Sequence, residues 1–335
     1  MSNVANMSKV LILTDGKAGH ENQSRAFARA LGCEPVLLPV RFKSPVAKSL
    51  SYLLDLFGIL SLKVFEDIKG LEDIEAVKDL KAVIGTGSGT FYAAKTIARR
   101  LGVPCGVVLY PRGYRLAGFD CILAPSFDRP DIVPNVVPVP ANLVAADAAF
   151  YEAGVKAFRE RYTPSGRPAV AVIVGGPNKC STLSADWMKA QLEQIFATYK
   201  PTNHEPLTTN HKPLTTNHEI WITTSRRTPP DVEAMVDSVP FDYKLLYSKD
   251  HFNPIPAFVS LASVIYVTAE STGMLSEACT FGTAEVHVLD NLKSGPHKFR
   301  RFIDGLAAAG HLGGSRKIDL SGQFARAREL LGLTG

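Results

Sequence analysis

AVAVIVGGPNK, residues 169–179, is the stretch that decides the fold. Its first six residues are a continuous apolar run, which is typical of a strand buried on both faces, and the run ends at two glycines. The same arrangement stands near the N-terminus, where residues 10–13 (VLIL) lead into a polar segment that contains glycine. A buried strand that restarts in mid-chain indicates two α/β domains.

The segments around these two strands alternate in the same way. Apolar runs predict strands at 36–38, 82–84, 105–109, 121–123, 220–223, 264–267 and 284–289, and helical patterns stand at 22–31, 91–101, 145–161 and 185–199. Such alternation predicts parallel sheets covered by helices, so we expect two Rossmann-like domains that face each other across a cleft. One hydrophobic core rarely grows past roughly 250–300 residues, so a chain of 335 residues fits two domains.

We place the N-terminal domain at residues 1–150 and the C-terminal domain at 165–320. Residues 162–168 (YTPSGRP) are polar and contain Pro and Gly, which is typical of a boundary. A final helix at 321–335 could return to the N-terminal domain.

The composition is that of a globular protein, with 46% hydrophobic and 21% charged residues. The net charge of +5 suits anionic small ligands or an anionic membrane surface, and without a long Lys/Arg run it speaks against nucleic acid as a partner. The sequence has no signal-peptide pattern and no stretch of the roughly 18–20 apolar residues that span a bilayer. Dispersed cysteines without a C-x-x-C pair indicate a reducing compartment (Cys33, Cys105, Cys121, Cys180 and Cys279). We therefore expect a cytoplasmic protein, at most peripheral at the inner face of the membrane.

Two loops of the N-terminal domain follow predicted strands, where ligands collect in open α/β sheets. In residues 14–23 (TDGKAGHENQ), Asp15 and His20 are the groups best placed to take a proton from an attacking hydroxyl. Residues 85–90 (GTGSGT) precede a helix and can cradle an anion. Either loop could instead be an ordinary turn before a helix. On the acceptor side of the site we expect Gly16, Lys17, Gly19, Asn22, Gln23, Gly87 and Ser88.

Groups that suit a diphosphate stand in three loops of the C-terminal domain, at residues 175–179 (GGPNK), 223–229 and 268–278. In the first of them, Lys179 could meet a phosphate. The arginines of residues 223–229 (TTSRRTP) match phosphate oxygens with their guanidinium forks, and the small residues of 268–278 (TAESTGMLSEA) present backbone N–H groups at a helix start. A carboxylate one helical turn further on, at Glu277, can accept two hydroxyls of a ribose. The expected donor-binding residues are Gly175, Asn178, Lys179, Ser225, Arg226, Arg227, Ser271, Thr272, Gly273 and Glu277.

Residues 202–219 (TNHEPLTTNHKPLTTNHE) repeat a seven-residue unit nearly three times and space three histidines evenly, at 204, 211 and 218. Metal binding is one interpretation. A low-complexity insertion in a surface loop is the other, and it is favoured because Pro206 and Pro213 prevent a continuous helix that would align the histidines. We expect no metal site.

Residues 50–65 hold an apolar stretch flanked by Arg41, Lys43, Lys48 and Lys63. A helix with this pattern could lie in a lipid interface and give the protein a peripheral membrane contact. It could equally be a helix packed on the sheet.

Four segments together resemble the mitochondrial fission ELM-type family, bacterial and plant proteins treated as glycosyltransferases: 13–23 (LTDGKAGHENQ), 175–179 (GGPNK), 223–229 (TTSRRTP) and 267–278 (VTAESTGMLSEA). The last segment is also similar to the donor-site motif of the peptidoglycan glycosyltransferase MurG and its GT-B relatives. The resemblance implies a GT-B fold, with Ser271, Thr272 and Gly273 at the phosphates, Glu277 at the ribose and His20 on the acceptor side.

The expected function is metal-independent transfer of a sugar from a nucleoside-diphosphate-sugar, without a further cofactor, to an acceptor that could be at a membrane. Arginine and a helix N-terminus would stabilise the leaving diphosphate. Two other functions stay open. One is a non-catalytic GT-B protein that binds partners or membranes, and the other is a nucleotide-sugar 2-epimerase, which acts on a single substrate.

Overall fold

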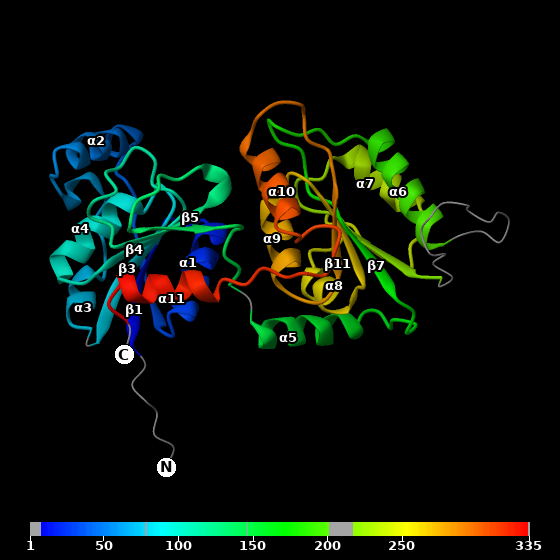
Figure 1. Ribbon diagram of the computed structural model, residues 1–335, viewed down its shortest axis with the longest axis horizontal. Coiled ribbons are helices and arrows are strands. Elements are labelled where there is room, and N and C mark those ends of the chain that lie inside the picture. Colours follow the sequence, from blue (N-terminus) through cyan, green and yellow to red (C-terminus); the bar gives the residue numbers. More distant parts are fainter. Residues whose placement is uncertain (1–7, 78, 146, 201–216, 334–335) are drawn as a thin grey trace, which may run out of the picture. The chain divides into compact units, whose positions relative to one another are not determined.

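The computed structural model describes residues 8–77, 79–145, 147–200 and 217–333. The chain divides into two compact units, one formed by the chain up to Ala145 together with the segment from Asp319, and the other by residues 146–318. Each unit is built on one parallel sheet with helices, as Figure 1 shows. The predicted fold class, α/β with two Rossmann-like domains, is confirmed.

The sheet of the N-terminal unit has six parallel strands in the order β2-β1-β3-β4-β5-β6. The strands are β1 (Lys9–Thr14), β2 (Glu34–Pro39), β3 (Leu80–Thr86), β4 (Cys105–Val108), β5 (Cys121–Pro125) and β6 (Val136–Val139). Side chains of a strand point to its two faces in turn, so Leu11 and Leu13 enter one core while Val10 and Ile12 enter the other.

Each of these two cores is closed by its own helices. Leu11 and Leu13 share a core with buried residues of α4 (Phe91–Leu101) and α3 (Leu71–Glu75), against which α2 (Pro45–Leu56) also packs. Val10 and Ile12 share the other core with α1 (Ala18–Ala30) and α11 (Ser321–Leu330). Helix α11 packs on β5 and β6, so the end of the chain belongs to the N-terminal unit. Short 3₁₀ turns lie at η1 (Leu62–Val64) and η2 (Ser126–Asp128).

The second sheet has five parallel strands in the order β11-β10-β7-β8-β9. They are β7 (Ala169–Ile173), β8 (Glu219–Thr223), β9 (Tyr243–Leu245), β10 (Val264–Thr268) and β11 (Glu285–Leu289). The quoted run of the sequence is thus the central strand, and all five of its residues are buried.

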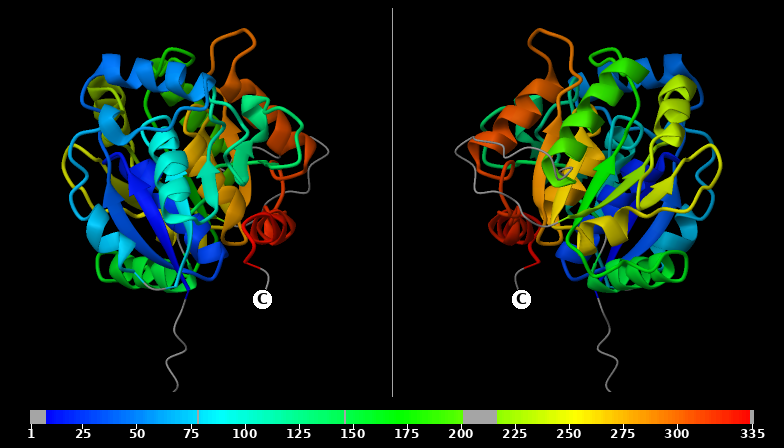
Figure 2. Two further views of the ribbon diagram at one scale, coloured as in Figure 1. Left: turned by 90° about the vertical axis from the view of Figure 1, so that its left-hand side faces the viewer. Right: turned by 90° about the vertical axis from the view of Figure 1, so that its right-hand side faces the viewer.

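Helices close both faces of this sheet as well. Val170 and Val172 enter a core with α6 (Ala185–Tyr199) and α7 (Pro230–Ser238). On Trp221 of β8 pack Phe158 of α5 (Ala148–Arg159) and Phe258 of α8 (Ile255–Leu261), with ring centroids 5.3 and 5.6 Å from that of Trp221. The unit is completed by α9 (Thr272–Thr280) and α10 (Lys298–Ala308), and Figure 2 shows both units from two sides.

Some expected boundaries differ from the observed ones. The expected limit at residue 150 falls inside α5, and the structure assigns that whole helix to the second unit. Strands β6 and β9 have no counterpart in the sequence patterns, because Pro138 interrupts the first and the second has three residues. Most of the TNH repeat lies outside the described residues; its last histidine, His218, is buried with its ring centroid 5.1 Å from that of Tyr199. No helix within the described ranges is long and apolar enough to cross a membrane.

Candidate functional site

Asp15 and His20 form a pair at the carboxyl end of β1. The imidazole Nδ1 of His20 lies 3.1 Å from each carboxylate oxygen of Asp15. Lys17 adds an ion pair to the same carboxylate at 2.9 Å, and its backbone N–H donates to it as well. Burial alone would raise the pKa of Asp15, but the hydrogen bonds from Lys17 and the charges of His20 and Lys17 lower it below its usual range. Asp15 is therefore an ionised partner that holds the ring of His20 in place.

The second N-terminal loop is shaped around this pair. Gly87 has φ +79°, and a Cβ at this position would lie 2.7 Å from Nδ1 of His20. A Cβ on Gly89 would lie 2.6 Å from Oδ2 of Asp15. Only glycine leaves room for the two side chains. The two N-terminal loops that the sequence predicts as functional thus pack against each other, and glycine is needed in the second because of side chains in the first.

The other predicted acceptor-side residues surround this pair without all touching it. Ser88 accepts a hydrogen bond of 2.8 Å from Nζ of Lys48, which comes from α2. Gln23 donates to the carbonyl oxygen of Gly19, and its other side-chain atom, Oε1, is buried with no partner among the described residues. Gly16 has φ +78°, whereas Gly19 lies in the first turn of α1 with open space beside it and Asn22 is exposed.

In the C-terminal unit, a hollow of about 330 Å³ opens beyond the end of β8. Ser225, Arg226 and Arg227 line it from the loop that follows the strand, and Met274 reaches it from the first turns of α9. Its remaining wall is Thr223, Thr224, Tyr247, His251, Phe252, Asn253, Pro254 and Ile255. The rings of Tyr247 and His251 are stacked, with centroids 4.5 Å apart. The hollow is therefore lined both by the positive charges of two arginines and by two stacked rings.

The glycines after β7 lock three loops together at this edge. Gly175 donates its N–H to Oγ1 of Thr268 at 2.8 Å and accepts a hydrogen bond of 2.6 Å from the Thr228 hydroxyl. A Cβ on Gly175 would collide with Oε1 of Glu270, and one on Gly176 with the backbone of Arg227. The loops after β7, β8 and β10 therefore approach one another more closely than any other residue type would permit.

Glu270 is a candidate that the sequence patterns did not single out. Its side chain is 2% exposed; Oε1 accepts a hydrogen bond of 3.0 Å from the Thr268 hydroxyl, and Oε2 is buried without a partner among the described residues. A buried carboxylate oxygen without a donor costs free energy, which is commonly tolerated where a ligand supplies the donor. The only signal in the sequence was its place in the predicted ligand loop.

Glu277 lies in a different environment. The hydroxyl of Tyr151, on α5, donates to its Oε1 at 3.2 Å. Burial raises the pKa of Glu277, and the hydrogen bond from Tyr151 opposes that rise only in part. Helix α9 thus presents Met274 to the hollow, while Glu277 faces α5.

The remaining predicted donor residues lie at the same edge of the sheet. Ser271 is buried at the N-cap of α9, Thr272 begins the helix, and Gly273 is exposed with open space beside it. Asn178 holds the turn after β7, since its Oδ1 accepts from the N–H of Cys180 at 2.7 Å, and Lys179 is exposed. No cluster of three or more His, Cys, Asp or Glu that could hold a metal occurs in the described part of the chain.

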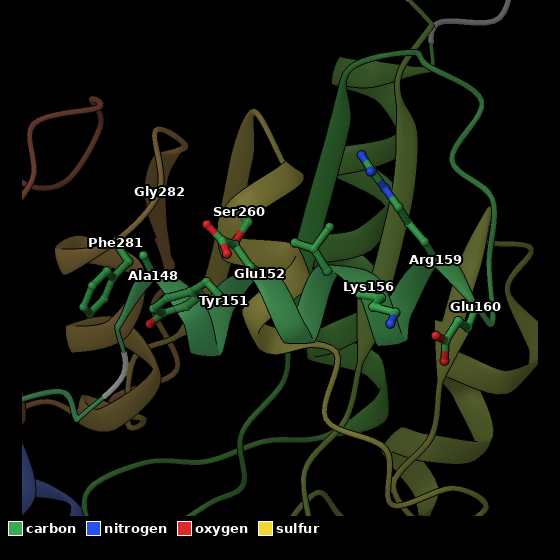
Figure 3. Close-up of a pocket in the computed structure, with 10 residues that line it drawn as sticks. Ala148, Tyr151, Glu152, Lys156, Arg159, Glu160, Ser260, Phe281 and Gly282 are labelled. Atoms are coloured by element: carbon green, nitrogen blue, oxygen red, sulfur yellow. The ribbon is translucent and has the colours of Figure 1, made fainter. Parts of the chain in front are cut away.

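A second, wider hollow of about 760 Å³ lies along α5 (Figure 3). Tyr151 and Phe281 close one end, with ring centroids 4.5 Å apart, and Lys156 and Arg159 extend from the helix towards the other. None of the predicted site residues lines it. It adjoins the surroundings of Glu277 through Tyr151, whose hydroxyl donates to the Glu277 carboxylate, and through Phe281, whose backbone N–H donates to the Glu277 carbonyl oxygen.

Comparisons with known proteins agree with the motifs. A family model described as mitochondrial fission ELM1 matches residues 18–316. No curated protein matches the sequence. Among solved structures, a Staphylococcus aureus MnaA–UDP complex is 14% identical with TM-score 0.47, covering 97% of this chain and 88% of that chain. A UDP-GlcNAc 2-epimerase from Neisseria meningitidis bound to UDP-GlcNAc is 14% identical with TM-score 0.47, covering 96% of this chain and 90% of that chain. Acinetobacter baumannii MurG is 15% identical with TM-score 0.46, covering 97% of this chain and 93% of that chain.

Proposed function

Because the chain belongs to the mitochondrial fission ELM1 family, we propose that it transfers a sugar from a nucleoside-diphosphate-sugar to an acceptor hydroxyl. The observation that carries the proposal is the hollow at the carboxyl edge of the second sheet, which is lined by Arg226, Arg227 and, from the first turn of α9, Met274. Positive charge, backbone N–H groups and a helix N-terminus at one place are what a diphosphate requires.

The donor would bind with its diphosphate between the arginines and α9. The stacked rings of Tyr247 and His251 offer a flat face to the base, and a hollow of about 330 Å³ is of a size to receive a nucleoside. The unpartnered Oε2 of Glu270 would accept a hydrogen bond from a hydroxyl of the donor. We assign Glu277 a supporting role through Tyr151 rather than a direct contact with the ribose.

His20 would act as the general base. With Asp15 ionised, the N–H group at Nδ1 of His20 would donate a hydrogen bond to that carboxylate, which leaves the lone pair on Nε2. The acceptor hydroxyl gives its proton to Nε2, and its oxygen forms a bond to the anomeric carbon. The bond from that carbon to the diphosphate breaks, and the diphosphate leaves with the electron pair. Arginine stabilises the developing negative charge.

A thermal-shift and calorimetric titration with UDP, GDP, ADP and their sugars tests the donor site. We expect one nucleotide class to raise the melting temperature of the wild type and of Arg159→Ala, but not of Arg226→Ala/Arg227→Ala. Arg159 is the matched control because it is exposed in the same unit and lines the other hollow. A double arginine variant that binds like the wild type would place the donor elsewhere.

Product analysis then separates transfer from the two other functions. Conversion of the donor sugar in the absence of any acceptor would identify a 2-epimerase. Absence of binding to every nucleotide and nucleotide-sugar would identify a non-catalytic protein. Transfer predicts that free nucleoside diphosphate is released only when an acceptor is present and that His20→Asn abolishes the release.

A further inference from the structure

Exposed apolar side chains gather on one short segment of the N-terminal unit. Of the nine large hydrophobic residues that are exposed in the described chain, six lie between residues 46 and 59. Their exposed fractions are 77% for Val46, 44% for Leu50, 52% for Leu53, 63% for Leu56, 69% for Phe57 and 50% for Ile59. The other three, Leu37, Ile132 and Phe150, are scattered. Scattered residues of this kind are normal, but a contiguous group marks an interaction surface.

These residues form a stripe because of their spacing. Val46, Leu50, Leu53 and Phe57 follow one another at intervals of four, three and four, so they lie along one side of α2. Figure 1 shows α2 at the outer margin of the N-terminal unit. We call Val46, Leu50, Leu53, Leu56, Phe57 and Ile59 the α2 surface.

The helix is held on the unit by polar residues of its opposite side. Ser51 is fully buried and its hydroxyl lies 2.8 Å from that of Tyr114. Asp55 is 3% exposed and pairs with Lys95 of α4 at 2.7 Å. An ordinary amphipathic helix turns its apolar stripe to the core and its polar side to water. Helix α2 packs Ala47, Tyr52 and Leu54 on the core and carries a second apolar stripe on its outer side. The buried Ser51 and Asp55 fix this orientation.

Positive charge surrounds the α2 surface. Arg115 lies beside Gly58, with its guanidinium 3.1 Å from where a Cβ of that glycine would be. Arg99 and Lys63 line a hollow together with Gly58 and Leu60, and Lys43 is exposed just before the helix. The only acidic residue of α2 is Asp55, which faces inward. Basic side chains around apolar ones suit the headgroups and the acyl boundary of an anionic bilayer.

We propose that the α2 surface docks the N-terminal unit on an anionic lipid surface. Leu53, Phe57 and their neighbours would enter the acyl boundary, while Lys63, Arg99 and Arg115 meet the headgroup phosphates. A second copy of the chain fits this surface less well, because a twofold contact would bring the two basic rims together. The proposal does not depend on sugar transfer, since neither the site at His20 nor a donor takes part in docking.

Flotation of the full chain with vesicles tests the proposal. We expect the wild type to float with vesicles of phosphatidylcholine and phosphatidylglycerol, less with phosphatidylcholine alone, and less as salt is raised. Leu53→Ser/Phe57→Ser should lower the partition coefficient by at least about tenfold. Ile132→Ser removes an even more exposed apolar side chain from the same unit and should float as the wild type does.

The charge is tested separately. Lys63→Gln/Arg99→Gln should weaken flotation with the anionic vesicles and flatten its salt dependence, while the matched loss of two charges in Lys156→Gln/Arg159→Gln should not. Circular dichroism and the melting temperature establish that each variant is folded. The proposal would be overturned if the wild type remained at the bottom of the gradient, without the anionic vesicles, at low salt. The proposal would also be overturned if Leu53→Ser/Phe57→Ser floated as well as the wild type. The same holds if the wild type bound no vesicles but formed a dimer that Leu53→Ser/Phe57→Ser could not form.

Discussion

The carboxylate of Glu270 fills the space that a side chain on Gly175 would need, and its Oε2 is buried without a partner among the described residues. The two residues come from loops after the neighbouring strands β10 and β7. These loops lie at the edge of the sheet where Arg226 and Arg227 line the hollow. The glycine thus makes room for a carboxylate that is held in position but incompletely hydrogen-bonded. This combination suits ligand binding better than stability.

Replacing Glu270 by glutamine should separate these two roles. We expect Glu270→Gln to leave the melting temperature of the free protein unchanged or raise it, because a buried carboxylate oxygen without a donor becomes a neutral amide atom. Donor affinity should fall by about 10- to 100-fold, since a hydrogen bond to a charged group contributes about 1.5–3 kcal/mol. Calorimetry with the nucleotide-sugar that shifts the wild type measures the loss. A variant that is strongly destabilised yet binds donor normally would assign Glu270 a structural role.

Gly87→Ala should disturb the Asp15–His20 pair. The new methyl group would meet the imidazole of His20, and φ of +79° is strained for alanine, so the free energy of unfolding should fall by about 2 kcal/mol. Gly19→Ala is the control, because Gly19 has open space around it and lies in a helix, where alanine is favoured. Urea unfolding of both variants gives the comparison. Equal stabilities would mean that the ring of His20 does not lie against the glycine loop.

The ion pair of Asp15 predicts a pH dependence of stability. The pKa of Asp15 is lower in the folded chain than 3.8, the usual pKa of aspartate. Asp15 therefore stabilises the fold fully above pH 3.8, and this stabilisation is lost as pH falls through the lower pKa of the folded chain. We expect the difference in free energy of unfolding between the wild type and Asp15→Asn to shrink as pH falls below about 4. Denaturant titrations across this range measure it. A difference that stays the same from about pH 5 down to about pH 2 would contradict the assigned charge state.

Most of the fold follows from apolar runs in the sequence. Val10–Leu13 and Ala169–Val174 predict an interior strand of each sheet, because buried parallel strands have to be apolar on both faces. The loops after these strands follow from glycine and polar residues. The short strands β6 and β9 give no such signal. Their positions depend on pairing with β5 and β8, which are set by the rest of each sheet.

Of the two carboxylates in residues 268–278, the sequence patterns predicted Glu277 as a ligand-binding residue and not Glu270. Glu270 and Glu277 both stand in the predicted ligand loop, and only the fold shows that one packs on Gly175 and the other accepts a hydrogen bond from Tyr151. The orientation of α2 is a similar case. Its apolar stretch fits either a packed helix or a lipid surface, and the pairing of Asp55 with Lys95, forty residues along the chain, decides which side faces out.

This buried pair supports the last prediction. Nζ of Lys95 donates to Asp55 at 2.7 and 3.0 Å, and both side chains are almost fully buried. Asp55→Ala would leave the charge of Lys95 uncompensated, so the free energy of unfolding should fall by about 3–5 kcal/mol. Asp237→Ala, which breaks an exposed pair with Lys249, should change it little. Chemical denaturation of both variants provides the measurement.

The pH dependence of Asp55→Ala then identifies the cause. Burial lowers the pKa of Lys95 even in the presence of Asp55. The hydrogen bond and the charge of Asp55 oppose this effect most strongly, so the pKa should fall further without them. The unfolded chain therefore binds this proton more tightly than the folded chain does, and the free energy of unfolding of the variant should rise as pH increases from 7 towards 10.5, the usual pKa of lysine. A loss of stability that is the same at all pH values would mean that the variant is destabilised by a cavity at the base of α2 rather than by a buried charge.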